Sequence, residues 1–346
     1  MIQSYAFPGR IEEDILQIAA QQIPYMRTQW FSQLMKENEQ MLLKLIGCRG
    51  GRVMFFTSSG TGAMDAIVQN YVAARGKAFV IDGGSFGHRW AELCEYHGVE
   101  SEVMQVPFAC DIDYDVLEKR VTQTKPQVLL CQHHETSSGQ LFDLQRISDI
   151  CKAHGVSLVA DVISSFLADP LDMDAMGVDV AVTSTQKGLN LPPGVALVFL
   201  SKKVLDVPFL HHNYYFDFQD NLKNLERGQT PFSPATTLFM QLHERLLRNM
   251  QLGVDTLVKD TQRKAYFFRR LCKEHGWEVP AQRPSNAITG FCIRRNADIL
   301  FTELQKQGIY IMPSGGRKDF FRVSHMGAQE EAELEQLATA IAKICL

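Results

Sequence analysis

Short apolar runs alternate with longer segments of helical period along the first two-thirds of the chain. The expected strands are Val53–Thr57, Ala78–Ile81, Glu102–Val106, Val128–Gln132, Ser157–Ala160, Val178–Thr183 and Val195–Leu200. The expected helices lie near Gly62–Ala74, His88–His97, Tyr114–Val121 and Leu144–His154. Strands that are apolar along their whole length are typical of a parallel sheet buried on both faces. The pattern predicts a doubly wound α/β domain with a mostly parallel seven-stranded sheet between helices.

The last third of the chain has a different pattern. Residues 207–235 interrupt the alternation with aromatic residues, histidines and prolines. The segments that follow are a long helix from Thr237 towards His275, strands at Ile288–Ile293 and Phe320–Val323, and a closing helix near Gln329–Ile344. A chain of 346 residues is long enough for two domains. We expect a large α/β domain over residues 15–235 and a smaller α+β domain over residues 236–346, with residues 1–14 joined to it.

Composition and charge exclude several classes of partner. Lys and Arg number 35 against 39 Asp and Glu, a net charge of -4, with no long run of one sign. Nucleic-acid and acidic-membrane partners usually need a concentrated basic surface, so neither is expected. No run is long and apolar enough to span a membrane, and the N-terminus lacks the pattern of a signal peptide. The eight cysteines form no C-x-x-C pair, which favours buried thiols in the cytoplasm over disulfides or zinc.

The ends of the predicted strands are where a ligand is expected, because open parallel sheets bind ligands beyond the carboxyl ends of their strands. After the first strand, "TSSGTGAMDA" places Ser59, Gly60, Thr61 and Gly62 in a small turn that leads into a helix. The free N–H groups and positive dipole of a helix N-terminus suit a phosphate. A purely structural turn stays an alternative, and neither the Walker loop nor the dinucleotide fingerprint is present.

Two further strand ends carry candidate groups. Phe86, in a loop after the second strand, offers a flat ring for stacking, although core packing is an alternative role. After the fourth strand, "HHETSSGQ" offers the hydroxyl of Thr136. Its adjacent histidines, His133 and His134, point to opposite faces of an extended segment, so no metal site is expected there.

A carboxylate and an amine complete the set. Asp161 ends the fifth strand, and Lys187 follows the sixth, 187 − 161 = 26 residues later. A buried Asp needs a compensating partner, and an ordinary Asp–Lys ion pair would supply one. Together with a phosphate cup, a stacking ring and a hydroxyl donor, however, the pair matches pyridoxal 5'-phosphate. This cofactor needs a lysine for its aldehyde and a carboxylate for its pyridine nitrogen.

Four motifs carry a resemblance to a known family over roughly residues 50 to 330. They are "SSGTGAMDA", "HHETSSGQL", "LVADVISSF" and "DVAVTSTQKGLNLPPGVALVFLS". With them the chain resembles the class V aminotransferases of fold type I, which depend on pyridoxal phosphate. Within that family it is similar to the alanine–glyoxylate, serine–pyruvate and 2-aminoethylphosphonate–pyruvate aminotransferases.

The resemblance implies a role for each matched residue. Lys187 forms the Schiff base, Asp161 binds the pyridinium nitrogen, Phe86 stacks on the ring and Thr136 lies near the ring. The phosphate site comprises Ser59, Gly60, Thr61, Gly62 and Gln186. The family forms homodimers with shared active sites, and the loop Gln229–Ser233 resembles the one that reaches the partner's phosphate through Thr230 or Ser233. Arg322, in "FFRVSHMG", takes the position that binds the substrate α-carboxylate.

The implied reaction moves an amino group from a small amino acid such as alanine or serine to a 2-oxo acid such as glyoxylate or pyruvate. The alternatives are a 2-aminoethylphosphonate–pyruvate aminotransferase, a lyase or cysteine desulfurase on the same scaffold, and a binding protein without catalysis. The N-terminus departs from the family, since "FPGRIEED" keeps only Pro8-Gly9 of a Gly-Pro-Gly-Pro type entry. Arg317 and Lys318 are either solvated charges or a site for a second anionic group on the substrate.

Overall fold

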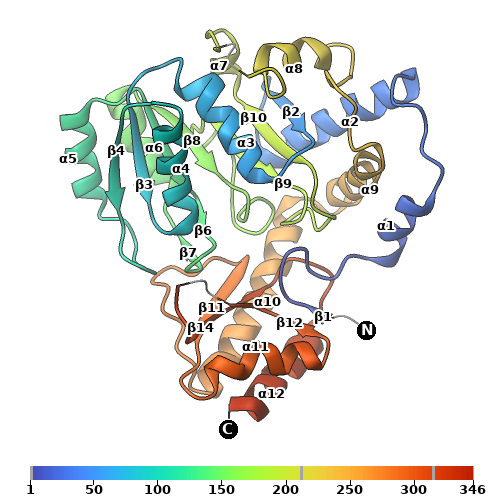
Figure 1. Ribbon diagram of the computed structural model, residues 1–346, viewed down its shortest axis with the longest axis vertical. Coiled ribbons are helices and arrows are strands. Elements are labelled where there is room, and N and C mark those ends of the chain that lie inside the picture. Colours follow the sequence, from blue (N-terminus) through green and yellow to red (C-terminus); the bar gives the residue numbers. More distant parts are fainter. Residues whose placement is uncertain (1–2, 211–212, 314–315, 346) are drawn as a thin grey trace.

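The structure is a computed structural model that describes residues 3–210, 213–313 and 316–345. Its main element is a seven-stranded sheet with the strand order β2-β10-β9-β8-β5-β3-β4 (Figure 1). The strands are β2 (Arg52–Phe56), β3 (Ala78–Asp82), β4 (Ser101–Gln105), β5 (Val128–Gln132), β8 (Ser157–Asp161), β9 (Val180–Ser184) and β10 (Ala196–Leu200). β10 runs antiparallel to β2 and β9, and the other neighbouring pairs are parallel. The predicted mostly parallel seven-stranded sheet is confirmed.

Helices cover both faces of this sheet. The chain steps from β3 to β4 in one direction and from β4 back to β5 and β8 in the other, so right-handed crossovers place the connecting helices on opposite faces. One face carries α3 (Gly60–Ile67), its π-helical continuation η2 (Val68–Val72) and α4 (Ser85–Tyr96); the other carries α5 (Tyr114–Thr124) and α6 (Leu144–His154). Beside β2 lie α2 (Gln29–Ile46), α8 (Phe218–Leu225) and α9 (Thr236–Leu252).

The C-terminal part of the chain forms a second, smaller sheet with the strand order β11-β14-β13 (Figure 1). Its strands are β11 (Ile288–Cys292), β13 (Met312–Pro313) and β14 (Phe320–Ser324), and its helices are α10 (Val254–Glu274), α11 (Ala297–Lys306) and α12 (Glu331–Cys345). The N-terminal strand β1 (Gln3–Ser4) pairs in parallel with β12 (Ile309–Tyr310). Short elements complete the chain: α1 (Glu13–Gln17), η1 (Ile18–Ala20), β6 (His134–Glu135), β7 (Gln140–Leu141) and α7 (Lys202–Leu205).

Two sequence predictions need correction. The single helix expected from Thr237 towards His275 is two helices, α9 and α10, because Gly253 between them has φ 78° and ψ 151°, which no helix accommodates. Phe86 lies in the first turn of α4 and not in a loop. No helix was predicted between β8 and β9, and this crossover, residues 162–179, indeed consists of turns.

The hydrophobic core is divided into separate clusters. The largest fills both sides of the seven-stranded sheet, with Val80, Leu130 and Val182 fully buried. A second cluster lies in the C-terminal part, around Phe291 and Ile341. A third, small cluster contains Ala168, Ala287, Ile288, Met312 and Met326, and Phe7 packs against it. Ala168 follows β8, whereas the other buried members come from the C-terminal part, so this cluster joins the two sheets.

Candidate active site

Lys187 lies in the tight connection between β9 and β10. The connection is closed by hydrogen bonds from Thr185 N to Val195 O at 3.0 Å and from Leu191 N to Thr185 O at 3.0 Å. At the next position, a Cβ on Gly188 would lie 2.0 Å from the carbonyl oxygen of Phe166, so only glycine allows this close approach. The backbone therefore fixes Lys187, whose side chain is buried with 8% of the residue exposed.

The amine of Lys187 is surrounded by groups from distant parts of the chain. Burial lowers its pKa to about 7, while the Asp161 carboxylate raises it and the Arg322 guanidinium lowers it further. The Nζ atom lies 3.3 Å from the centroid of the Phe7 ring. Sequence reasoning noted the unusual "FPG" at the N-terminus but did not place Phe7 beside the lysine.

Asp161 is the last residue of β8 and is also buried. Burial raises the pKa of its carboxyl to about 7, against the opposing effects of a hydrogen bond from Ile163 N, at 2.8 Å, and of the charge on Lys187. Among the described residues, no ion pair or hydrogen bond joins Asp161 directly to Lys187. The ordinary Asp–Lys ion pair is therefore not what this structure contains, and the buried carboxylate has no contacting cation in the described chain.

The N-terminus of α3 lies at the same edge of the sheet. Ser59 caps the helix, accepting a hydrogen bond from Gly62 N at 3.4 Å. The N–H groups of Gly60 and Thr61 have no hydrogen-bond acceptor within the described chain. A Cβ on Gly60 would lie 2.6 Å from Ile163 Cδ1 and 3.5 Å from Ser184 Oγ, which places this turn against the ends of β8 and β9. Free N–H groups at a helix N-terminus suit a phosphate.

Buried polar atoms without partners lie around this turn. Ser184 Oγ and Gln186 Oε1 have no hydrogen-bond partner among the described residues. Buried polar atoms are normally paired, so such atoms at a strand edge indicate a polar ligand. Together with the free helix N–H groups, the uncompensated carboxylate and the amine, they fit pyridoxal phosphate. The residues present are therefore compatible with this cofactor.

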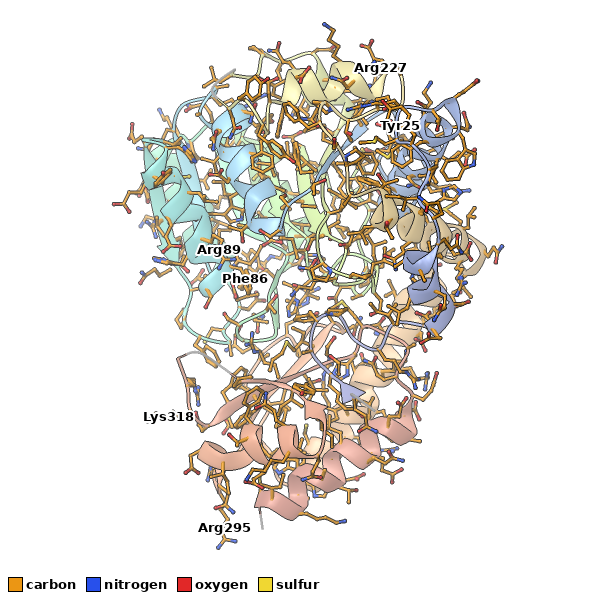
Figure 2. The ribbon with its side chains drawn as sticks, turned by 45° about the vertical axis from the view of Figure 1, so that its right-hand side comes forward. Tyr25, Phe86, Arg89, Arg227, Arg295 and Lys318 are labelled. Atoms are coloured by element: carbon orange, nitrogen blue, oxygen red, sulfur yellow. The ribbon has the colours of Figure 1, made fainter. Side chains whose placement is uncertain are left out.

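Phe86 is held in place by a residue that sequence reasoning missed. The fully buried carboxylate of Glu135 accepts hydrogen bonds from Phe86 N at 3.3 Å and Gly87 N at 3.1 Å, so it caps the N-terminus of α4. The guanidinium carbon of Arg89 lies 4.9 Å from the centre of the Phe86 ring, and Arg89 Nη1 donates to Thr61 Oγ1 at 3.1 Å. Figure 2 shows Phe86 and Arg89 side by side at the end of α4 that faces the C-terminal part. Arg89 thus links the aromatic ring to the first turn of α3.

Thr136 and Arg322 also lie together. Arg322, in the middle of β14, donates from Nη1 to Thr136 O at 3.0 Å and from Nη2 to Pro313 O at 2.7 Å. Its Nε is buried and has no partner in the described chain. The hydroxyl of Thr136 donates to Ser164 Oγ at 2.8 Å, and Ser164 Oγ lies 2.8 Å from His134 Nδ1. Burial and the nearby charge of Lys187 hold the pKa of His134 well below its usual range, so His134 is neutral.

The hydrogen bonds of Thr230 stay within its own loop and reach Arg27. Thr230 Oγ1 donates to Phe232 O at 2.7 Å, and Arg27 donates to the carbonyl of Thr230 at 2.7 Å. The Phe232 ring stacks on Tyr215 at 5.1 Å. Ala235, two residues after Ser233, donates its N–H to Thr57 Oγ1 at 3.3 Å, so this loop lies beside the end of β2 that leads into α3. In the described chain no hydrogen bond joins Thr230 or Ser233 to the residues around Lys187.

Arg317 forms an ion pair with Asp319 at 3.1 Å, and Figure 2 shows Lys318 at the outer side of the C-terminal part. Within residues 3–210, 213–313 and 316–345, no three His, Cys, Asp or Glu side chains are grouped as metal ligands. None of the helices described there is long and apolar enough to cross a membrane.

Comparison with known proteins identifies the family. The model of the class-V aminotransferases matches residues 20–315. The chain is 27% identical over 331 residues to the L-aspartate–glyoxylate aminotransferase of Paracoccus denitrificans, covering 91% of this chain and 83% of that protein. It is 28% identical over 301 residues to a protein of Synechococcus named soluble hydrogenase, small subunit, covering 84% and 78%.

The fold gives the same result. The crystal structure of an aspartate aminotransferase of subgroup IV from Thermus thermophilus superposes with a TM-score of 0.90 and 25% identity, covering 99% of this chain and 98% of that chain. The resemblance inferred from the four sequence motifs is thereby confirmed. Since the family model covers most of the chain, this protein belongs to the class-V aminotransferases and is a transaminase of fold type I that depends on pyridoxal phosphate.

Proposed function

We propose that Lys187 binds the cofactor aldehyde covalently and that the enzyme transfers the amino group of a small amino acid, such as alanine or serine, to glyoxylate or pyruvate. The observation that carries the proposal is the buried Lys187 amine, whose pKa is lowered to about 7 and which Asp161 and Arg322 both influence. The relative from Paracoccus, named as a glyoxylate aminotransferase, supports glyoxylate as the acceptor.

The proposed roles follow from the surroundings of each side chain. When bound, pyridoxal phosphate supplies an aldehyde for the amino group and a cationic ring that takes up the electron pair left at the substrate α-carbon. Asp161 holds the proton on the ring nitrogen. Lys187, with a pKa of about 7, is partly unprotonated at neutral pH and removes the proton from the α-carbon of the donor.

The remaining site residues bind and orient. Ser59, Gly60, Thr61, Gly62 and Gln186 hold the phosphate at the N-terminus of α3. Phe86 covers the ring, and Thr136 lies between this site and Arg322. Arg322 binds the substrate α-carboxylate, because a guanidinium matches a planar carboxylate with two parallel hydrogen bonds. The buried, unpartnered Nε of Arg322 supports this role.

We also propose a cytoplasmic homodimer in which Thr230 and Ser233 reach the partner's phosphate site. In the described chain, Thr230 bonds to Phe232 and Arg27 and not to the residues around Lys187, which supports this arrangement. So do exposed aromatic side chains on the same side of the chain: Tyr25 is 67%, Trp30 54% and Tyr214 88% exposed.

The division into a large domain, residues 15–235, and a smaller domain, residues 236–346 with residues 1–14, is likewise proposed. The domain division is supported by Tyr5, which belongs to the C-terminal core cluster. The proposed cytoplasmic location is supported by the eight cysteines, all of which are free thiols.

The proposed substrates are tested by following the cofactor absorbance. The protein saturated with pyridoxal phosphate is mixed separately with alanine, serine, aspartate and 2-aminoethylphosphonate. We expect alanine or serine to convert the aldehyde form to the amine form, and glyoxylate or pyruvate to restore it. If only 2-aminoethylphosphonate converts the aldehyde form, this compound and not alanine or serine is the amino donor. If none of the four compounds converts it, the proposed function is contradicted.

Arg322→Lys should raise KM for both the amino donor and the 2-oxo acid by about tenfold to a hundredfold, because a lysine cannot form the paired hydrogen bonds. The change in kcat should be smaller. Steady-state kinetics with both substrates measures the changes in KM and kcat separately. Arg317→Lys is the matched control, and its KM values should equal those of the wild type because Arg317 is paired with Asp319. Unchanged KM values in Arg322→Lys would remove Arg322 from the substrate site.

A further inference from the structure

The N-terminal segment is fastened on both sides of the active site. Tyr5 O accepts a hydrogen bond from Ser324 N at 2.8 Å, next to the strand position of Arg322. Further along, Arg10 O accepts from Ala328 N at 3.0 Å and from Asn190 Nδ2 at 2.7 Å. Asn190 belongs to the same connection as Lys187. The backbone between Tyr5 and Arg10 is therefore held between β14 and the Lys187 connection.

Phe7 lies between these two attachments. The face of its ring is 3.3 Å from Lys187 Nζ. It also packs against the small cluster that contains Ile288 and Met312. Met312 is the register partner of Arg322 in the C-terminal sheet. The Phe7 ring thus contacts the amine of Lys187 and packs against a cluster to which β11 and β13, the two neighbours of the Arg322 strand, contribute residues.

A substrate must meet both of these groups, because its carboxylate binds Arg322 and its α-carbon reacts beside Lys187. We propose that Phe7 is a specificity-determining residue whose ring forms a wall of the substrate pocket between Lys187 and Arg322 and restricts the donor to small side chains. This inference rests on the proposed function and adds a residue to its site.

The size of the effect follows from how pockets discriminate between side chains. One methylene group more or less in an apolar pocket changes kcat/KM by roughly tenfold to two-hundredfold. Replacing the phenyl ring by a methyl group removes several carbon atoms from the wall. A donor with a larger side chain, such as leucine, should gain most from that space.

The contact between ring and amine provides a second, independent signature. The face of an aromatic ring attracts a cation, so the Phe7 ring favours the protonated form of Lys187. Replacing Phe7 by leucine removes this attraction and keeps an apolar side chain of similar bulk. The pKa of Lys187, already lowered by burial to about 7, should then fall further, by about one unit. Phe7→Tyr keeps the aromatic face and should leave that pKa unchanged.

The first experiment compares donors of different size. In Phe7→Ala, the ratio of kcat/KM for leucine to that for alanine should rise at least about tenfold above the wild-type ratio. Tyr266→Ala, which removes an exposed aromatic side chain on α10 (59% exposed), should keep the wild-type ratio. A Phe7→Ala protein that binds the cofactor and shows an unchanged ratio would overturn the proposal.

The second experiment uses cofactor-free protein and needs no catalysis. Amines are modified with trinitrobenzenesulfonate at a series of pH values, and the rate at Lys187 is read from its peptide by mass spectrometry. The midpoint should move to lower pH in Phe7→Leu and stay in place in Phe7→Tyr. A change in how easily the reagent reaches Lys187 alters the modification rate but not its pH midpoint. Equal midpoints in the wild type, Phe7→Leu and Phe7→Tyr would therefore refute the contact between Phe7 and Lys187. If alanine proves not to be a substrate, the donor assay fails already in the wild type, while this measurement still tests Phe7.

Discussion

Lys187→Ala should lower kcat for transamination by at least about a thousandfold, because the substitution removes both the group that binds the aldehyde and the base that moves the α-proton. Steady-state turnover with the best donor measures the loss. The protein should still fold, since Lys187 forms no ion pair in the described chain and lies on a connection closed by backbone hydrogen bonds. Added methylamine should restore part of the rate by supplying the missing base from solution.

Lys306→Ala serves as the matched control for this variant. Lys306 is on α11 in the C-terminal part, and its side chain is 66% exposed. Removing it should leave kcat at the wild-type value. A Lys187→Ala enzyme with a kcat within tenfold of the wild type would exclude the role assigned to Lys187.

Asp161→Asn should lower kcat by about a hundredfold or more, because a neutral amide cannot hold the proton on the cofactor ring nitrogen. The amide oxygen can keep the hydrogen bond from Ile163 N, so the local backbone should not change. Pre-steady-state measurement of the donor half-reaction separates this chemical defect from slow product release. Wild-type rates in the variant would contradict the role of the carboxylate.

We also expect Asp161→Asn to change how the unfolding temperature depends on pH. Burial raises the pKa of Asp161 from 3.8 to about 7, so its contribution to stability is complete below about pH 4 and is lost as the pH rises through about 7. In the cofactor-free Asp161→Asn protein, the amide side chain at position 161 carries no charge at any of these pH values. At pH 8 it should therefore unfold at the same or a higher temperature than the wild type, and the difference should shrink towards pH 4.

Asp169→Asn is the control for burial alone. Asp169 is a fully buried carboxyl with its pKa raised to about 6, bonded to Ser285 and to Asn286 N at 2.8 Å, and it has no place in the proposed site. Its replacement should shift the melting temperature without a hundredfold loss in kcat.

The sequence predicts the sheet well for a physical reason. Buried parallel strands have to be apolar along their whole length, so runs such as Val128–Gln132 stand out and coincide with β5. The break at Gly253 is less visible, because a lone glycine in a helical pattern is often tolerated. The helix α2 was missed because its polar face interrupts the apolar pattern with "MKENEQ".

In the candidate site, too, some residues can be predicted from their own sequence segment, whereas others are placed by contacts with residues distant in sequence. Lys187 and Asp161 follow apolar runs that end at one edge of the sheet, and residue order alone predicts them. The placement of Phe86 depends on Glu135, whose carboxylate comes from 49 positions away. Phe7 reaches Lys187 from the N-terminal end of the chain, because its neighbours Tyr5 and Arg10 bond to Ser324, Ala328 and Asn190. No local pattern encodes such contacts, since they form only when the two sheets are assembled.

The covalent attachment of the cofactor to Lys187 is the central claim, and borohydride reduction tests it most directly. The protein saturated with pyridoxal phosphate is reduced, digested and mapped by mass spectrometry. We predict a pyridoxyl adduct on the peptide that contains Lys187, and none in Lys187→Ala. An unmodified Lys187 peptide, or an adduct that remains in Lys187→Ala, would contradict the account.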